Sequence, residues 1–139
     1  MSLLNKFAAV LTPDFSLYID MPAALKIYNI YRSRLLGQFW QRNGIKVIPT
    51  VSWAEEDSFE YCFDGLPREA TLAVSTVGIG RNAEAKKLYQ DGLDEMIKRL
   101  HPQHLIVYGP SIGATYPSSL DIISHENSMT ERLHSLGVK

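Results

Sequence analysis

The chain has 139 residues, of which 45% are hydrophobic and 21% are charged, and its formal net charge is −1. This length suits one domain with a single core, and the composition is too apolar for a disordered chain. The near-neutral charge argues against a generally basic nucleic-acid binder. With only one cysteine, Cys62, an internal disulfide is excluded.

Targeting signals are also not expected. The apolar run ahead of Pro13 is too short for a signal peptide, and no stretch approaches the roughly 20 apolar residues that a membrane span needs. We therefore expect a reducing, cytoplasmic setting.

The segment from Lys46 to Gly80 indicates the fold class. Two apolar, β-branched runs flank a short segment that begins with acidic residues and ends at Gly65-Leu66-Pro67. A strand with one solvent-exposed face would alternate between apolar and polar side chains, and neither run does so. The segment predicts a strand, a crossover and a second strand, both covered on two faces in a parallel sheet.

In chain order, the predicted elements alternate between strands and helices. Strands are expected at residues 7–12, 46–52, 71–76 and 104–108, with helices at 21–43, for about two turns from Glu55, and at 83–100. The pattern predicts one α/β domain over residues 1–139, with three layers and a mainly parallel sheet of four or five strands. Both an open sheet and half of a (β/α) barrel fit this order. The core spans residues 7–109, and the tail 110–139 offers a fifth strand at 120–124 and a helix at 129–136.

The two long helices each show an apolar face. For the first helix we expect this face to lie on the sheet, with Lys26 and Ser33 on the solvent side and Gly44 in the left-handed position after the helix. For the helix at 83–100, Asn82 is the expected N-cap, and Gly92 on its inner face should allow a close approach to the sheet. The apolar face of the first helix consists of Leu25, Tyr28, Tyr31, Leu35, Leu36 and Phe39.

Polar and aromatic residues follow several predicted strands, at the edge where ligands bind to parallel sheets. An equally simple explanation is that polar turn formers occupy the rim of any such sheet. Asp14 and Asp20 would serve as acid and base or as hard-metal ligands, although Asp20 is also explained as a helix N-cap. The candidate ligand-binding residues are Asp14, Asp20, Thr50, Trp53, Ser75, Thr76, Gly78, Gly80, Arg81 and Tyr108.

The turn from Val77 to Asn82 joins a strand to a helix start, where backbone N–H groups can hold phosphate beside Arg81. It lacks the third glycine of the dinucleotide fingerprint and the lysine of the P-loop, so a plain tight turn also explains it. We expect no cofactor and no metal site, and no motif names a reaction.

Four further patterns have simple explanations that involve no function. Gly109 to Gly113 matches G-x-S-x-G with Asp121, His125 and His134 behind it, but the residues after it make a poor helix start, so we interpret the match as coincidence. His101 and His104 lack a third metal ligand. Cys62 is read as a core residue. The basic cluster of Arg32, Arg34, Arg42 and Lys46 could contact nucleic acid, but its spread around the helix favours a solvated face.

Several motifs carry a resemblance to a known family. TPDFSLYIDMP, NIYRSRLL, GIKVIPTVSW, FEYCFDGLP, AVSTVG and EMIKRLHPQHLIVYG, spread over residues 8–109, resemble an uncharacterised bacterial and phage family, a domain of unknown function. The resemblance implies a phage or mobile-element setting within a bacterial host, and it brings no known activity or catalytic residues. Members have a further segment ahead of the PDFSLY motif and a longer strand-forming end. A shortened sheet would expose an edge, which favours pairing with a second copy or another protein.

Two functions from different classes are consistent with these observations. One is a phage or mobile-element interaction protein that binds a host or phage macromolecule, either alone or as a homo-oligomer. The other is a domain that binds or hydrolyses a nucleotide or another phosphate-bearing small molecule at the strand-end rim. The weak catalytic signals favour the first.

Overall fold

The structure is a computed structural model, and it describes residues 3–80 and 82–126. The strands are β1 (Val10–Leu11), β2 (Val47–Ile48), β3 (Thr71–Ser75), β4 (His104–Tyr108) and β5 (Asp121–His125). The helices are α1 (Ala23–Arg42) and α2 (Ala83–Leu100), with short 3₁₀ turns η1 (Leu4–Lys6) and η2 (Glu56–Glu60). The α/β class is therefore confirmed, and the second predicted helix is a 3₁₀ turn.

All strand pairs are parallel. β1 and β2 form a two-stranded sheet, and β3, β4 and β5 form a three-stranded sheet in that order. The predicted single sheet of four or five strands is therefore confirmed only in part. A bridge between Thr50 and Ala73 links the two groups, with Ala73 N–H donating to Pro49 O at 2.9 Å and Val51 N–H donating to Ala73 O at 2.8 Å. Pro49 has no N–H to donate towards β3, so the link between β2 and β3 is confined to the two hydrogen bonds of Ala73.

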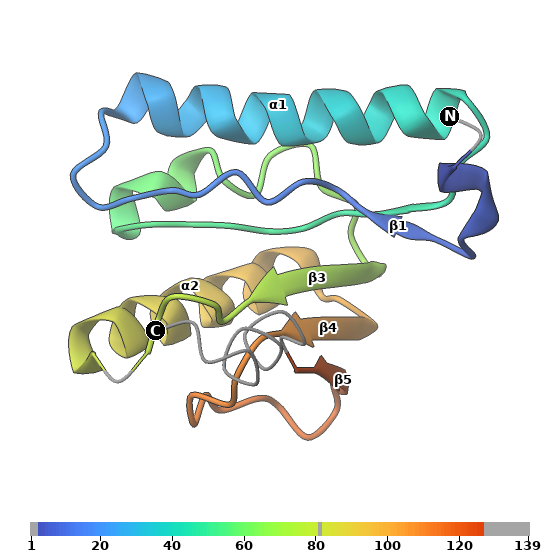
Figure 1. Ribbon diagram of the computed structural model, residues 1–139. Helices are drawn as coiled ribbons and strands as arrows, with labels where there is room; N and C mark the ends of the chain where they lie inside the picture. The colour runs from blue at the N-terminus through green and yellow to red at the C-terminus, as the bar shows by residue number, and fades with distance from the viewer. Residues whose placement is uncertain (1–2, 81, 127–139) are drawn as a thin grey trace, which may run out of the picture.

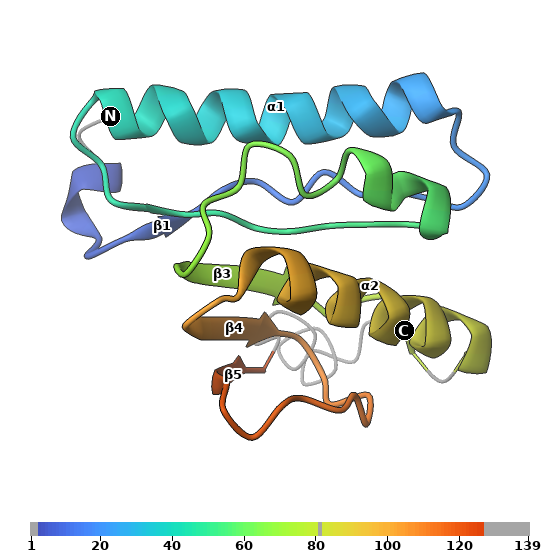
Figure 2. The same cartoon turned by 180° about the vertical axis from the view of Figure 1, so that it is seen from behind.

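Both long helices lie on the same face of this sheet. A Cβ at Gly37 of α1 would lie 2.8 Å from the methyl group of Thr12 and 3.7 Å from Val47, whereas α2 packs on a cluster that includes Val51. Val47 and Val51 point to the same side because side chains alternate along a strand. With strands in chain order, right-handed crossovers produce this arrangement, which is that of half a (β/α) barrel. Figures 1 and 2 show α1 beside β1 and α2 beside β3 and β4.

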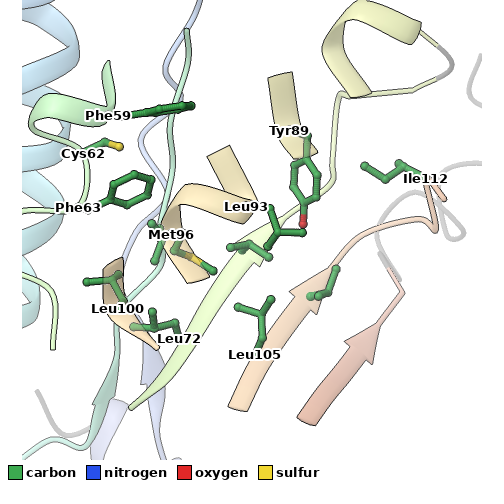
Figure 3. Close-up of a cluster of buried hydrophobic side chains, with 13 residues drawn as sticks. Phe59, Cys62, Phe63, Leu72, Tyr89, Leu93, Met96, Leu100, Leu105 and Ile112 are labelled. Atoms are coloured by element: carbon green, nitrogen blue, oxygen red, sulfur yellow. The ribbon is translucent and has the colours of Figure 1, made fainter. Parts of the chain in front are cut away.

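The main core lies between α2, η2 and the strands β3 and β4 (Figure 3). α2 begins as predicted, since Asn82 Oδ1 accepts from the N–H groups of Glu84 at 2.9 Å and Ala85 at 3.2 Å. Gly44 has a φ of +79°, which confirms the left-handed position after α1. The buried residues of α2 are Tyr89, Gly92, Leu93, Met96 and Leu100, so Gly92 lies on the inner face as predicted.

The prediction for α1 is wrong in one important respect. Its buried residues are Lys26, Ser33 and Gly37. Five of the six residues of the apolar face that was expected on the sheet are exposed, and the sixth, Leu36, is half-buried. Ser33 Oγ lies 3.2 Å from Thr12 Oγ1, so a small polar side chain fills the narrow gap to β1. Because its buried side is small, α1 lies close to β1 and β2 and turns its large side chains outward.

The tail of the chain is described up to residue 126. The fifth strand predicted at 120–124 is confirmed as β5, which extends the sheet beyond β4. The helix predicted at 129–136 lies outside the described residues. Among the described helices, neither is long and apolar enough to cross a bilayer.

The close packing of α2 on Trp53 can be tested. A Cβ at Gly92 would lie 2.2 Å from Trp53 Nε1, so Gly92→Ala should force the indole ring to move. We expect urea unfolding to show a loss of about 1–3 kcal/mol, as overpacking usually causes. The exposed control Lys98→Ala should change the free energy of unfolding by less than about 0.5 kcal/mol. A gain of about 1 kcal/mol in Gly92→Ala, as helix propensity alone would give, would show that the ring does not fill this space.

Candidate functional site

A cavity of about 430 Å³ lies at the carboxyl ends of β1, β2 and β3. This is the side of the sheet on which α1 and α2 begin (Figure 1). Its lining comes from Asp14 and residues 16–20 after β1, residues 51–54 after β2, Ser75 and residues 77–79 after β3, and Ala85, Leu88 and Tyr89 of α2. The cavity therefore occupies the edge at which the sequence predicted a ligand site.

Half of the predicted rim residues meet in this cavity. Their strands are neighbours in the sheet, so the residues that follow them converge at one edge. The members of the predicted set that line the cavity are Asp14, Asp20, Trp53, Ser75 and Gly78.

Two predicted rim residues have internal partners instead. Thr50 is buried, with its hydroxyl donating to Thr12 O and its N–H donating to Thr12 Oγ1, both at 2.8 Å. Thr76 is also buried, and its hydroxyl donates to Pro110 O at 2.8 Å. These two threonines join neighbouring segments of backbone and do not line the cavity.

The remaining predicted rim residues are spread along the edge. Tyr108 pairs with Ser75 in the register of β3 and β4, but it does not line the cavity. Gly80 adopts a φ of +57° in the turn before α2 and also lies outside the lining. Arg81 lies outside the described residues.

The two candidate carboxylates stand in different environments. Asp14 accepts a hydrogen bond from the hydroxyl of Ser52, which follows β2. The reading of Asp20 as a helix cap is wrong, because the residue before α1 is Pro22 and no side chain caps this helix. Asp20 is exposed and lines the cavity. Both carboxylates thus belong to the cavity.

Trp53 forms a rigid apolar wall. Its indole N–H donates to Leu88 O at 3.2 Å, and its ring packs against Tyr89 with the ring centroids 5.4 Å apart. Phe63 lies on the same ring at 6.3 Å, and Gly92 leaves room for its edge. Contacts with α2 and with Phe63 thus hold the indole ring of Trp53 in place.

The charge of the cavity favours cations over anions. The described lining residues include Asp14 and Asp20 but neither lysine nor arginine. The first N–H groups of α2, which could hold a phosphate, already donate to Asn82. The arrangement suits an amine or another positively charged group better than a phosphate.

A buried ion pair lies beside the cavity. Lys26, which is 3% exposed, donates to Glu55 and, at 3.3 Å, to the carbonyl oxygen of Ile19 in the cavity wall. Burial on its own would lower the pKa of Lys26, but the hydrogen bond and charge of Glu55 outweigh it and raise that pKa. Burial would likewise raise the pKa of Glu55, but Lys26 lowers it overall. The pair connects α1 to the segment that follows β2.

The basic cluster is largely committed to internal contacts. Arg34 donates to three carbonyl oxygens, those of Thr50 at 3.3 Å, Cys62 at 2.9 Å and Asp64 at 3.2 Å. Arg32 stacks over the ring of Phe15 with its guanidinium carbon 3.9 Å from the centroid. Nucleic-acid binding through Arg32, Arg34, Arg42 and Lys46 stays a prediction, and two of its four residues already have partners within the chain.

The other sequence patterns have structural explanations. Cys62 is fully buried, and burial raises its pKa to about 12, so it is an unreactive core thiol. His101 closes α2 in a left-handed conformation, and His104 Nδ1 lies 2.8 Å from Asp121 Oδ2. No helix follows Gly109 in the described residues, as a nucleophile elbow would require. His134 lies outside the described part.

Sequence reasoning missed the loop after β1. Tyr18 and Ile19 line the cavity and are 61% and 55% exposed. Two bulky apolar side chains in a loop beside a predicted strand end were a signal for this wall. The burial of Lys26 had no such signal, because its partner Glu55 lies 29 residues further along the chain.

The fold and the cavity define a small parallel α/β protein with a ligand-sized hollow at the carboxyl ends of its strands. The chain matches the family described as a domain of unknown function, DUF4417, over residues 1–125, and it belongs to that family. It is similar to the Gene 1 protein of Mycobacterium phage L5, with 48% identity over 105 residues, which cover 76% of this chain and 46% of the phage protein. It is similar to the Gene 1 protein of Mycobacterium phage D29, with 48% identity over 101 residues, which cover 73% of this chain and 37% of that protein.

The chain thus spans less than half of the length of these two relatives. No solved structure matches it. The resemblance to an uncharacterised phage family is confirmed.

The ion pair between Lys26 and Glu55 predicts a pH dependence. Because the pKa of Glu55 is lowered in the folded chain, Glu55 contributes to the free energy of unfolding above its unfolded-state pKa. This contribution is lost as the pH falls through the folded-state pKa. Because the pKa of Lys26 is raised in the folded chain, Lys26 contributes to the free energy of unfolding below pH 10.5, its ordinary pKa. This contribution is lost as the pH rises beyond the folded-state pKa. Glu55→Gln should lower the melting temperature at pH 7 by roughly 5 °C and flatten its fall in acid.

The exposed neighbour Glu56 provides the control for this experiment. Glu56→Gln should leave both the melting temperature and its pH profile close to those of the unaltered chain. If Glu55→Gln and Glu56→Gln gave the same profile, the pair would have no role in stability.

Proposed function

We propose that this member of the phage family is an interaction protein that binds another protein chain through the outer face of α1. The observation that carries the proposal is a row of half-exposed large side chains along this helix. We call the row formed by Tyr28, Tyr31, Leu35 and Phe39 the α1 stripe. Its members are between 46% and 56% exposed.

The α1 stripe has the spacing of a helix-binding surface. Its residues recur at intervals of three, four and four, so they lie along one side of the helix. That side is opposite to Lys26, Ser33 and Gly37, which face the sheet. A partner helix can lie along such a row, as in other helix-in-groove interactions.

The chemistry of the stripe also suits a protein partner. Tyrosine and phenylalanine are enriched in the cores of protein interfaces, and aromatic anchors contribute much of the binding energy there. Tyr28 and Tyr31 stack on each other with their centroids 6.5 Å apart, so part of the row is already ordered. Flanking apolar residues Leu25 and Ile27 are 51% and 48% exposed and widen the surface.

Site-specific photo-crosslinking in bacteria that express the full chain tests this proposal. A benzophenone side chain at position 31 should yield discrete protein adducts, and Leu35→Ser with Phe39→Ser should reduce them about ten-fold, as loss of an anchor of 1.4 kcal/mol or more would. The same probe at Lys87, an exposed position on α2, is the matched control. Equal adducts from positions 31 and 87, or adducts that survive the double substitution, would contradict a role for the stripe.

The cavity at the strand ends supports a second candidate function, the binding of a small molecule. Its volume of about 430 Å³ falls within the range of roughly 300–1,000 Å³ that is usual for ligand sites. The rigid Trp53 wall and the carboxylates of Asp14 and Asp20 supply apolar contact and negative charge. These features favour a ligand that carries an amine or amidine rather than the nucleotide or phosphate that the sequence suggested.

A thermal-shift experiment separates these ligand classes. Benzamidine should raise the melting temperature of the full chain, and Asp14→Asn with Asp20→Asn should abolish that rise, because the cation loses both of its counter-charges. Asp91→Asn, an exposed change on α2, is the control and should leave the shift intact. A shift with AMP but not with benzamidine would support the phosphate ligand instead. No shift with either compound would contradict a small-molecule site.

A further inference from the structure

We infer that the protein bound to the α1 stripe is a second copy of this chain, with the two α1 helices antiparallel and a two-fold axis near Tyr31. This inference rests on the proposed function and names its partner. It is carried by the distribution of charge at the two ends of the helix and by the sizes of the side chains between them.

The first observation is the charge at the two ends of α1. Between Phe15 and Ala54 the sequence contains one acidic residue, Asp20, and it is exposed just ahead of the helix. Arg42 is exposed at the last position of the helix. The apolar row thus lies between a negative charge at its amino end and a positive charge at its carboxyl end.

The other cationic side chains of α1 have partners within the chain. Lys26 is buried against Glu55, Arg34 donates to backbone carbonyl groups, and Arg32 stacks over Phe15. Arg42, together with the exposed Lys46 just after the helix, therefore makes the carboxyl end of the helix positive. An antiparallel copy would place Arg42 of one chain beside Asp20 of the other, twice in each dimer, while a parallel copy would oppose like charges.

The side chains of the row complement one another in the same arrangement. With the axis near Tyr31, Tyr31 meets its own copy, and Tyr28 lies opposite Leu35 of the second chain. Phe39 lies opposite Ala24, so a large ring meets a small side chain at each end. The described helix is 20 residues and so about 30 Å long, which lets all of these pairs form together.

The edge of the sheet is a weaker basis for self-association. The sequence predicted an exposed edge, and β1 is the outer strand next to β2. β1 contains two residues, and short edge strands resist pairing with other chains. The α1 stripe offers a longer and more apolar surface than this edge.

Disulfide trapping tests the proposed axis on the full chain. Tyr31→Cys places two thiols beside each other across the axis, whereas Leu25→Cys, at similar exposure on the same helix, places them about 20 Å apart by the helix rise. Under mild oxidation, Tyr31→Cys should form covalent dimers at least about ten-fold faster than Leu25→Cys. The native Cys62 is fully buried and should not interfere. Equal rates at positions 25 and 31 would overturn the antiparallel arrangement.

Sedimentation of the unaltered chain and of charge variants supplies the second test. The unaltered chain should show a concentration-dependent rise from 15.7 kDa towards twice that mass. Arg42→Asp should weaken the dimer about five-fold, and the further change Asp20→Arg should restore it, since the pair is then reversed rather than lost. Failure of the double variant to recover would overturn the pairing of Asp20 with Arg42.

The failure of this inference can be separated from that of the proposed function. A chain that stays monomeric at high concentration and shows no trapping at position 31 would overturn the second copy as the partner. The photo-crosslinks from position 31 would then still identify another protein on the stripe. A dimer that persists in Leu35→Ser with Phe39→Ser would show that the copies meet elsewhere, and it would overturn this inference.

Discussion

Two hydrogen bonds at Ala73 hold the sheet together where Pro49 interrupts it. The N–H of Ala73 donates to Pro49 O, and its carbonyl accepts from Val51 N–H, so the pairing passes from β1 and β2 to β3 across a residue that cannot donate. This link connects the two-stranded parallel sheet to the three-stranded one. It also sets β1, β2 and β3 side by side, so that their carboxyl ends form a single edge with room for the cavity.

The way in which α1 packs follows from the same region. Thr12 of the first strand segment accepts from Thr50 N–H and lies beside Ser33 of the helix, so little space is left between helix and sheet. Gly37 and Ser33 fit that space, and larger apolar side chains do not. The side chains excluded from it form the α1 stripe. The close approach that joins helix and sheet is therefore also the reason that an apolar surface faces outward.

The cavity and the α1 stripe lie on different elements and differ in chemistry, since among the described residues the only helix that lines the cavity is α2. The cavity, beside the start of α1, is lined by carboxylates and by the tryptophan Trp53. The buried ion pair of Lys26 and Glu55 lies next to its wall. The stripe is apolar, with charge concentrated at its ends. A small cationic ligand suits the first surface and a protein chain suits the second, so one small domain provides two kinds of contact.

The sequence by itself determined the strands, the cap and inner face of α2, and the edge at which the cavity opens. These features depend on local signals, such as Asn82 ahead of a helix, or on strand order, which brings strand ends together. Only the tertiary structure decided which side of α1 is buried. Periodicity shows that a helix has an apolar face. Whether the sheet covers that face depends on the width of the gap at Thr12 and on Glu55, a distant residue that neutralises the charge of Lys26. Burial depends on what lies opposite, and a single helix does not contain that information.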